Sequence, residues 1–195
     1  MTTTPRFTVS KDLYKHNFDE FMQKCGELGY KNNSTRKAMR LNWIKSQYGA
    51  YWAFVKDNNI ISISGCHKFP GMDDTYRIGY RSVSLPGEDP FKGFSRYGYN
   101  AIPNRVLFQY QIRFAQQKGA KNFILTTNSN SDGHMYMSHM MQVRINKLTN
   151  LSEYLGEKEV FGVTQSLWKY NIKEYVKSIK ALKQEDYFII DELKW

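Results

Sequence analysis

The chain has 195 residues, and 28 lysines and arginines against 18 aspartates and glutamates give it a formal net charge of +10 at pH 7. Its length suits one domain with a full hydrophobic core, and 41% hydrophobic and 15% aromatic residues exclude a disordered chain. This basic protein is expected to meet an anionic partner, which is a nucleic acid, an acidic surface or a phosphorylated cofactor. Composition alone does not choose among them.

The compartment is inferred from what the sequence lacks. No apolar run approaches the ~18 residues of a membrane span, and the first residues carry no secretory signal. Cys25 and Cys66 lie in a predicted helix and a predicted strand, and both are typical of buried thiols rather than of a disulfide framework. These features favour the cytoplasm and no membrane contact.

The first half of the chain predicts two helices followed by an antiparallel meander. Ser10 is suited to cap a helix that ends before Gly29, and a second, basic helix is expected over 34–48. The first helix is expected to bury one stripe of residues: Tyr14, Phe18, Phe21, Met22, Cys25 and Leu28.

Strands follow these helices. A hairpin is predicted over 51–55 and 60–64, because the intervening Asp57, Asn58 and Asn59 tolerate positive φ in a tight turn. A third strand is expected over 75–85 after a turn at 71–74, and a long loop over 86–103.

The second half predicts helices alternating with strands. Pro103 opens a helix that ends at Gly119, and its buried stripe is Val106, Leu107, Tyr110 and Phe114. A buried strand over 123–127, a methionine-rich helix over 133–148, a strand over 160–168, an amphipathic helix after Asn171 and a terminal strand or tail over 187–190 complete the order. This order predicts an α+β domain.

Three segments carry a family resemblance. Residues 114–128, FAQQKGAKNFILTTN, are similar to the helix–strand step of the GNAT acyltransferase superfamily, in which a helix ends A-x-x-x-G before a strand that closes on an asparagine. Residues 83–86 resemble the end of the family's fourth strand, and 155–162 its glycine-containing return. The resemblance covers roughly residues 7–170.

The resemblance implies a fold and a domain organisation. A GNAT-like acyltransferase domain would span 1–170, with a mixed, mostly antiparallel sheet flanked by helices. Residues 171–195 would form an extra C-terminal helix and tail, packed on the same domain or on a second subunit, so that a homodimer stays open.

The resemblance also implies acetyl-CoA, or another acyl-CoA, as co-substrate. In the family, a Gln/Arg-x-x-Gly-x-Gly/Ala loop holds the pyrophosphate through backbone N–H groups. The corresponding loop here, 95–101, keeps a single glycine in register and has serine in place of Gln/Arg. The residues expected to bind the cofactor are Val83, Ser84, Leu85, Arg96, Tyr97, Gly98, Tyr99, Asn100 and Asn128.

Direct acyl transfer needs a base for the amine and an acid for the leaving thiolate. The family's acid is often a tyrosine after the fifth strand, which suggests Tyr136, with Tyr154 as its rival. Asp74, Glu88 and His67 lie near the strand where the family has its base, and solvated turn residues are the alternative interpretation of all three. Of these, His67 is favoured because imidazole titrates near neutrality.

No metal site is expected. His134 and His139 are five residues apart, which places them on different faces of a helix, and Cys66 and His67 point to opposite sides of a strand.

The sequence therefore favours an acyl-CoA-dependent N-acyltransferase acting on a small-molecule or peptide amine. The alternative is a non-catalytic GNAT-shaped domain that binds nucleic acid or a protein partner through basic helices. The basic residues in question are Lys31, Arg36, Lys37, Arg40 and Lys45 beside Trp43, and Lys173, Lys177, Lys180 and Lys183 near the C-terminus. No nucleic-acid-binding signature accompanies them.

Overall fold

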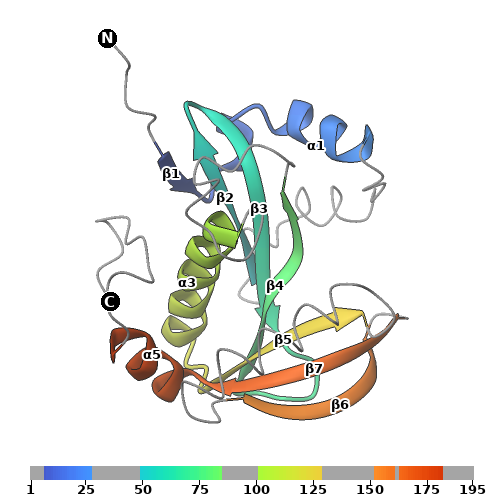
Figure 1. Ribbon diagram of the computed structural model, residues 1–195, viewed down its shortest axis with the longest axis vertical. Helices are drawn as coiled ribbons and strands as arrows, with labels where there is room; N and C mark the ends of the chain where they lie inside the picture. Colours follow the sequence, from blue (N-terminus) through green and yellow to red (C-terminus); the bar gives the residue numbers. More distant parts are fainter. Residues whose placement is uncertain (1–6, 28–48, 85–100, 129–151, 161–162, 182–195) are drawn as a thin grey trace. The chain divides into compact units, whose positions relative to one another are not determined.

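Seven strands form one mixed sheet in the order β1-β2-β3-β4-β5-β7-β6 (Figure 1). The computed structural model describes residues 7–27, 49–84, 101–128, 152–160 and 163–181. β4 and β5 run parallel, whereas β1–β2, β2–β3, β5–β7 and β6–β7 are antiparallel pairs. The predicted mixed, mostly antiparallel α+β sheet is thus confirmed.

The chain divides into two compact units. The first unit comprises residues 1–68 and 78–114, and the second comprises 69–77 and 115–195. β4 (Thr75–Ser84) and α3 (Ala101–Gln117) each contribute residues to both units. The second predicted helix (34–48), the methionine-rich helix (133–148) and the tail (187–190) lie outside the described residues, as does most of the 86–103 loop.

The hairpin of the first unit confirms its predicted turn. β2 (Gly49–Lys56) and β3 (Asn59–Lys68) pair around Asp57 and Asn58, which have φ of 46° and 67°. Short polar side chains tolerate this left-handed region, and two such residues in succession match the twist of a hairpin. The strands extend beyond the predicted 51–55 and 60–64, and Asn59 belongs to β3 rather than to the turn.

The predicted N-terminal helix starts later than expected. Residues Phe7–Ser10 form β1, which pairs antiparallel with β2, a 3-10 turn η1 follows at Leu13–Lys15, and α1 spans Phe18–Glu27. Ser10 does not cap a helix, because its hydroxyl accepts a hydrogen bond from the Asp12 N–H at 3.1 Å. A four-residue edge strand is specified by its partner β2 more than by its own sequence, so local periodicity did not reveal it.

The buried stripe of α1 is partly as predicted. Phe18, Phe21 and Met22 are buried, whereas Tyr14 lies before the helix and is 48% exposed, with its ring centroid 5.0 Å from that of Phe18. The three buried residues join a core cluster on β2, β3 and β4: Tyr51, Ala53, Val55, Ile60, Ile63 and Tyr80, together with Leu13. The helix therefore packs on one face of the hairpin.

The other face of the hairpin packs on α3. Trp52 follows Tyr51 in β2, so the two side chains point to opposite faces of the strand. The centroid of the Trp52 ring lies 5.5 Å from that of Phe114 in an edge-on contact. The predicted stripe of α3 is confirmed for the buried Val106 and Leu107, and Phe114 is half-buried. The Lys11 ammonium lies over both rings, 5.0 Å from the centroid of Trp52 and 5.1 Å from that of Phe114, and makes a cation–π contact with each.

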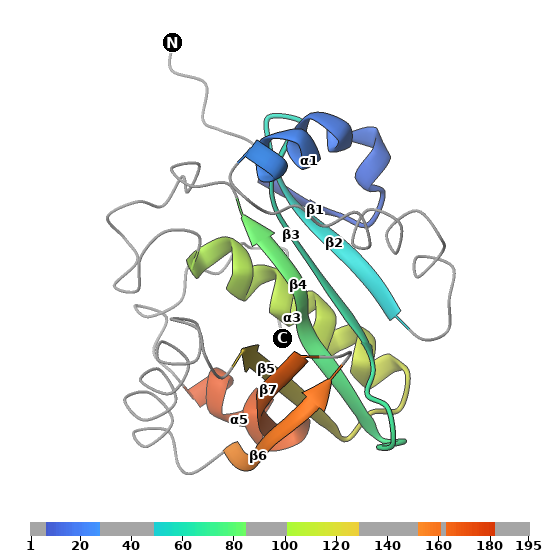
Figure 2. The same cartoon turned by 90° about the vertical axis from the view of Figure 1, so that its right-hand side faces the viewer.

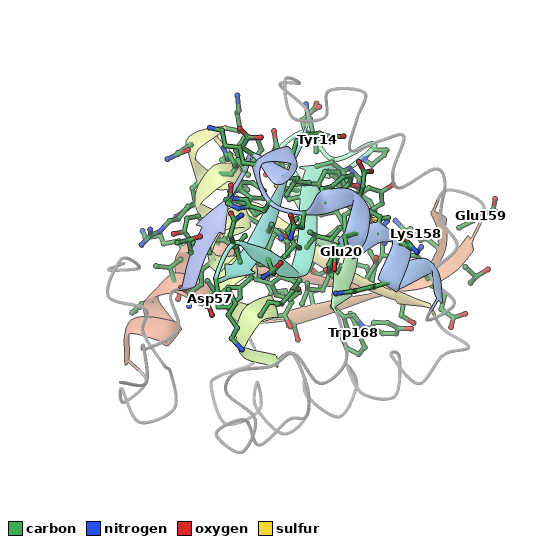
Figure 3. All side chains as sticks on the ribbon, turned by 90° about the horizontal axis from the view of Figure 1, so that it is seen from above. Tyr14, Glu20, Asp57, Lys158, Glu159 and Trp168 are labelled. Atoms are coloured by element: carbon green, nitrogen blue, oxygen red, sulfur yellow. The ribbon has the colours of Figure 1, made fainter. Side chains whose placement is uncertain are left out.

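The second unit contains β5 (Asn122–Asn128), β6 (Ser152–Val160), β7 (Val163–Asn171) and α5 (Ile172–Ala181) (Figure 2). The strand predicted over 160–168 is wrong in its bounds, because it joins the end of β6 to most of β7. The charged run at 157–159 hid β6 from sequence reasoning, since charged residues are rare inside sheets but suit an exposed edge strand. Glu159 extends away from β6 in Figure 3.

Aromatic rings fix α5 to the sheet of the second unit. Phe123 of β5 stacks on Tyr170 of β7 at 4.7 Å, and Tyr175 of α5 contacts both rings edge-on. Asn171 caps the helix, because its Oδ1 accepts the Glu174 N–H at 3.1 Å. The helix predicted after Asn171 is therefore confirmed. None of the helices in the described part of the chain is long and apolar enough to cross a membrane.

Cys66 is a buried, free thiol, as predicted. Burial raises the pKa of the thiol well above its ordinary value, and a hydrogen bond from the Ala50 backbone and the charge of Lys11 only partly oppose this. The side chain of Cys25 lies outside the described set.

Substitution of Gly65 by alanine should destabilise the first unit. A Cβ at Gly65 would lie 2.6 Å from Cε1 of Tyr51, whose side chain is fully buried and has no room to move. We expect Gly65→Ala to lower the free energy of unfolding by about 1–3 kcal/mol in urea titrations. In a Tyr51→Leu background the same change should cost less, because the ring is absent. An unchanged urea midpoint for Gly65→Ala would contradict this packing.

Cys66 should resist thiol reagents in the folded protein. In a Cys25→Ser variant, we expect Cys66 to react with a disulfide reagent at pH 8 about a hundredfold more slowly than a free thiol, because its raised pKa suppresses the reactive thiolate. Raising the pH should accelerate the reaction about tenfold per pH unit, without the levelling off that a thiol with the ordinary value of 9.0 shows above that pH. Full reactivity should return in urea, and equal rates in the folded and unfolded protein would rule out the buried thiol.

Candidate functional site

The parallel pairing of β4 with β5 ends early. The two strands pair only through Thr75–Asn122, Tyr76–Phe123 and Arg77–Ile124. β5 nevertheless continues to Asn128, paired with β7 on its other edge as far as Gln165. In the described part of the chain, the edge of β5 opposite β7 therefore has no strand partner after Ile124, and its backbone groups need partners other than a strand.

A glycine with a positive φ lies in β4 just after the ladder ends. Gly79 has a φ of 67°, a conformation that glycine adopts without the penalty of a Cβ. Its N–H donates a 2.7 Å hydrogen bond to Oε1 of Gln111, a residue of α3 in the same unit. A side-chain amide thus replaces a strand as the partner of this backbone group.

The amide of Gln111 has a second polar group that is not satisfied. Gln111 is fully buried, and its Nε2 has no hydrogen-bond partner in the residues that the structure describes. A backbone N–H can only donate, so the oxygen of the amide must face Gly79 and the nitrogen must point elsewhere. A buried donor without a partner costs about 1–3 kcal/mol, and this cost calls for an explanation at this position.

A buried arginine marks the end of the ladder in the second unit. Arg77 is 7% exposed, and its Nη2 donates a 2.7 Å hydrogen bond to Oε1 of Gln165 on β7. The bond crosses over β5 and ties the last paired residue of β4 to the strand beyond it. A charge-assisted bond of this kind is stronger than a neutral one, so it helps to hold the end of the ladder in place.

His67 is buried, so its interpretation as a solvated turn residue is wrong. It is 3% exposed, because β3 runs on to Lys68 and places the imidazole inside the unit. Its Nδ1–H donates to the Lys68 carbonyl at 2.7 Å, and its ring meets Tyr80 edge-on at 4.7 Å. This bond assigns the proton of the neutral ring to Nδ1 and makes Nε2 the basic nitrogen. Its role as a base stays a prediction.

Tyr154 is the more accessible of two tyrosines on neighbouring strands of the second unit. It is 49% exposed, its ring lies 4.5 Å from Trp168 of β7, and its hydroxyl lies 3.5 Å from Oγ of Ser166. Figure 3 labels Trp168. Tyr170 is buried instead, and burial, with a smaller effect of Tyr175, raises the pKa of its phenol. Tyr154 therefore remains the better placed of the two to exchange a proton with solvent or a ligand.

Few of the residues predicted for the cofactor can be located. Val83 and Ser84 are the last two residues of β4, and Asn128 is the last residue of β5. Each lies beyond the three-pair ladder on its own strand. The other predicted site residues lie outside the described ones: Leu85, Glu88, Arg96, Tyr97, Gly98, Tyr99, Asn100 and Tyr136.

Sequence reasoning missed Gly79 and Gln111. The signal for Gln111 was present, because it follows Leu107 by four residues and precedes Ala115 by four, which places a polar side chain on the buried stripe of α3.

Asp74, the rival candidate for the base, lies in the turn before β4, where its Oδ1 accepts a hydrogen bond from the Thr75 hydroxyl at 3.0 Å. Its backbone carbonyl also accepts the N–H groups of Lys121 and Asn122.

Two other predicted features concern metals and charge. Within the ranges that the structure describes, no three His, Cys, Asp or Glu side chains are grouped as a metal site would need. Lys173 and Lys177 are exposed on α5, as a solvated helix face requires, and Lys183 lies outside the described ranges.

The comparisons with known proteins rest on structure. No protein-family model matches the sequence, and a search among curated proteins finds no match. Among solved structures, the chain is similar to an acetyltransferase of the GNAT family from Staphylococcus aureus Mu50, with a TM-score of 0.54 and 11% identity over 87% of this chain and 99% of that one.

Two further solved structures are similar to the chain. A Salmonella typhimurium protein, assigned as an acetyltransferase and solved with its cofactor acetyl-CoA, has a TM-score of 0.53 at 10% identity, over 87% of this chain and 95% of that one. An uncharacterized protein from Bacillus halodurans has a TM-score of 0.57 at 10% identity, over 93% and 91% of the two chains. Identities this low speak for the fold and leave the activity open. The chain therefore has the fold of the GNAT acetyltransferases, as its helix–strand pattern predicted.

Proposed function

We propose that this protein is an acyl-CoA-dependent N-acyltransferase that moves an acetyl group to an amine. The observation that carries the proposal is the short β4–β5 ladder, which ends at Arg77 and Ile124 and is followed by Gly79 with its positive φ. The GNAT resemblance implies that coenzyme A lies beyond the ends of these strands. The Salmonella typhimurium protein of the same fold was solved with acetyl-CoA.

Acetyl-CoA fits the groups that the second unit offers. The pantetheine part of the molecule carries amide groups and a thioester, which need donors and acceptors in a row. The edge of β5 after Ile124, which has no strand partner among the described residues, offers such a row, as sheet edges do when they bind an extended peptide. The net charge of +10 suits the polyanionic nucleotide end of the ligand.

We assign the binding residues as the resemblance implies. The strand ends at Val83, Ser84 and Leu85 and at Asn128 would contact the pantetheine. The loop residues would hold the pyrophosphate through backbone N–H groups, with arginine adding charge: Arg96, Tyr97, Gly98, Tyr99 and Asn100.

The chain's own contribution to the reaction is proton transfer and orientation. Acetyl-CoA, when bound, supplies an activated acyl group with a thiolate leaving group. A base must take the proton of the amine, and we assign this role to His67 or Glu88. An acid must supply a proton to the thiolate, and we assign it to Tyr136, with the exposed Tyr154 as its rival. The acceptor is a small molecule or a peptide with a free amine.

Acetyl-CoA should stabilise the protein against heat. A ligand present at a hundred times its dissociation constant adds about 2.7 kcal/mol to the free energy of unfolding. We therefore expect a rise of several degrees in the unfolding midpoint at millimolar acetyl-CoA, measured by differential scanning fluorimetry. No rise at that concentration would overturn the proposal.

Two control titrations distinguish the cofactor from charge alone. Inorganic pyrophosphate at the same concentration should raise the midpoint much less, because it offers the anion without the pantetheine and adenosine. Stabilisation by mixed DNA or RNA oligonucleotides that weakens steeply with salt, together with no response to acetyl-CoA, would favour the non-catalytic nucleic-acid-binding domain instead.

A further inference from the structure

We infer that Gln111 binds the acyl donor directly, with its Nε2 donating a hydrogen bond to a carbonyl oxygen of the pantetheine–thioester chain. The inference rests on the proposed function and names a residue that the GNAT resemblance did not supply. It follows from the burial, the orientation and the chemistry of a single side-chain amide.

The burial of Gln111 is exceptional for its helix. α3 contains four glutamines, of which Gln116 and Gln117 are exposed, Gln109 is half-buried and Gln111 is fully buried. The neighbours of Gln111 on the buried stripe, Leu107 and Ala115, are apolar and also fully buried. Burying an amide at this position is unfavourable unless both of its polar ends find partners.

One end of the amide is already assigned. Oε1 accepts the Gly79 N–H at 2.7 Å, and this donor fixes which way the amide faces. Nε2 is left with two N–H donors and no hydrogen-bond partner in the described part of the protein. Because Oε1 and Nε2 belong to one small planar group, the unsatisfied donor lies beside Gly79, two residues after the last β4–β5 pair.

The chemistry of the donor selects the ligand group. A neutral amide N–H suits a neutral carbonyl oxygen, whereas phosphate oxygens are better matched by arginine, lysine or the N-terminus of a helix. Acetyl-CoA carries neutral carbonyls in its pantetheine amides and in its thioester. The same amide would then accept the Gly79 N–H with its oxygen and donate to the ligand with its nitrogen.

A purely structural role predicts different behaviour. If Gln111 only held Gly79, its Nε2 would be unaffected by the ligand, and substitution would disturb stability rather than recognition. The experiment therefore observes the Nε2 protons of the wild-type chain as well as the affinity of variants.

The affinity test compares two positions on α3. Gln111→Met keeps the length of the side chain and removes the donor, and Gln116→Met makes the same change at an exposed position of the same helix. We expect Gln111→Met to weaken acetyl-CoA binding about tenfold by titration calorimetry, which is the loss of about one hydrogen bond to a buried group. Gln116→Met should bind like the wild type. Free coenzyme A is titrated in parallel: a loss with acetyl-CoA alone assigns the bond to the thioester carbonyl, and a loss with both ligands assigns it to a pantetheine amide.

The spectroscopic test does not depend on a variant's binding. The Gln111 side-chain signals in a 15N–1H spectrum are assigned by their loss in Gln111→Met, or in Gln111→Glu should the first variant fail to fold. In the wild type, we expect these signals to move downfield in the proton dimension when acetyl-CoA is added. Signals that stay in place would overturn the inference, whatever the affinity of the variants, because Gln111 would then only accept the hydrogen bond from Gly79. Unchanged affinity of Gln111→Met would overturn it as well. Failure of the wild type to bind either acetyl-CoA or coenzyme A would overturn the proposed function, and this inference with it.

Discussion

The hydrogen bond from the Gly79 N–H to the Gln111 side chain is the constraint on which the candidate site depends. A β-strand satisfies its backbone through neighbouring strands, and a chain that leaves one neighbour must find other partners for the groups released. In β4 the ladder to β5 ends at Arg77, and the N–H two residues later is satisfied by a helix side chain. The strand can therefore end its parallel pairing without leaving this donor unpaired.

The position of this bond agrees with the way the chain divides. One of the places where the chain passes between the two compact units falls between Arg77 and Ile78, within β4 and next to Gly79. On the N-terminal side, the buried guanidinium of Arg77 ties β4 to β7 through Gln165. On the C-terminal side, Ser82 of β4 bonds to Ser64 of β3 at 2.6 Å. The first residues of β4 thus bond to β7 and its later residues bond to β3, and Gly79 lies between these two parts of the strand.

The sequence predicted those elements whose own residues determine them. Two consecutive residues that tolerate positive φ identified the hairpin at Asp57 and Asn58, and an asparagine cap with apolar periodicity identified α5. β1 and β6 were missed because both are edge strands, which owe their conformation to a neighbouring strand. His67 was misjudged for a related reason. Its burial depends on the length of β3 and on Tyr80 of β4, and neither is encoded beside it. Long-range pairing of this kind is absent from local periodicity.

The candidate site shows the same division between local and long-range information. Asn128 and the pair Val83 and Ser84 were predicted from a family pattern, and each lies at the end of its strand. Gln111 matched no motif, yet a polar residue on an otherwise apolar stripe conflicts with the pattern of its helix. Such conflicts are expected where a protein gives up stability for function. A buried amide with one satisfied end is costly in the free chain, and the ligand carbonyl that we propose would recover this cost. The net charge of +10 attracts many anions, whereas the neutral Nε2 donor of Gln111 would discriminate among them. On the proposed function, the two features would act at different steps: charge would attract a polyanionic ligand, and Gln111 would select one that carries a carbonyl chain.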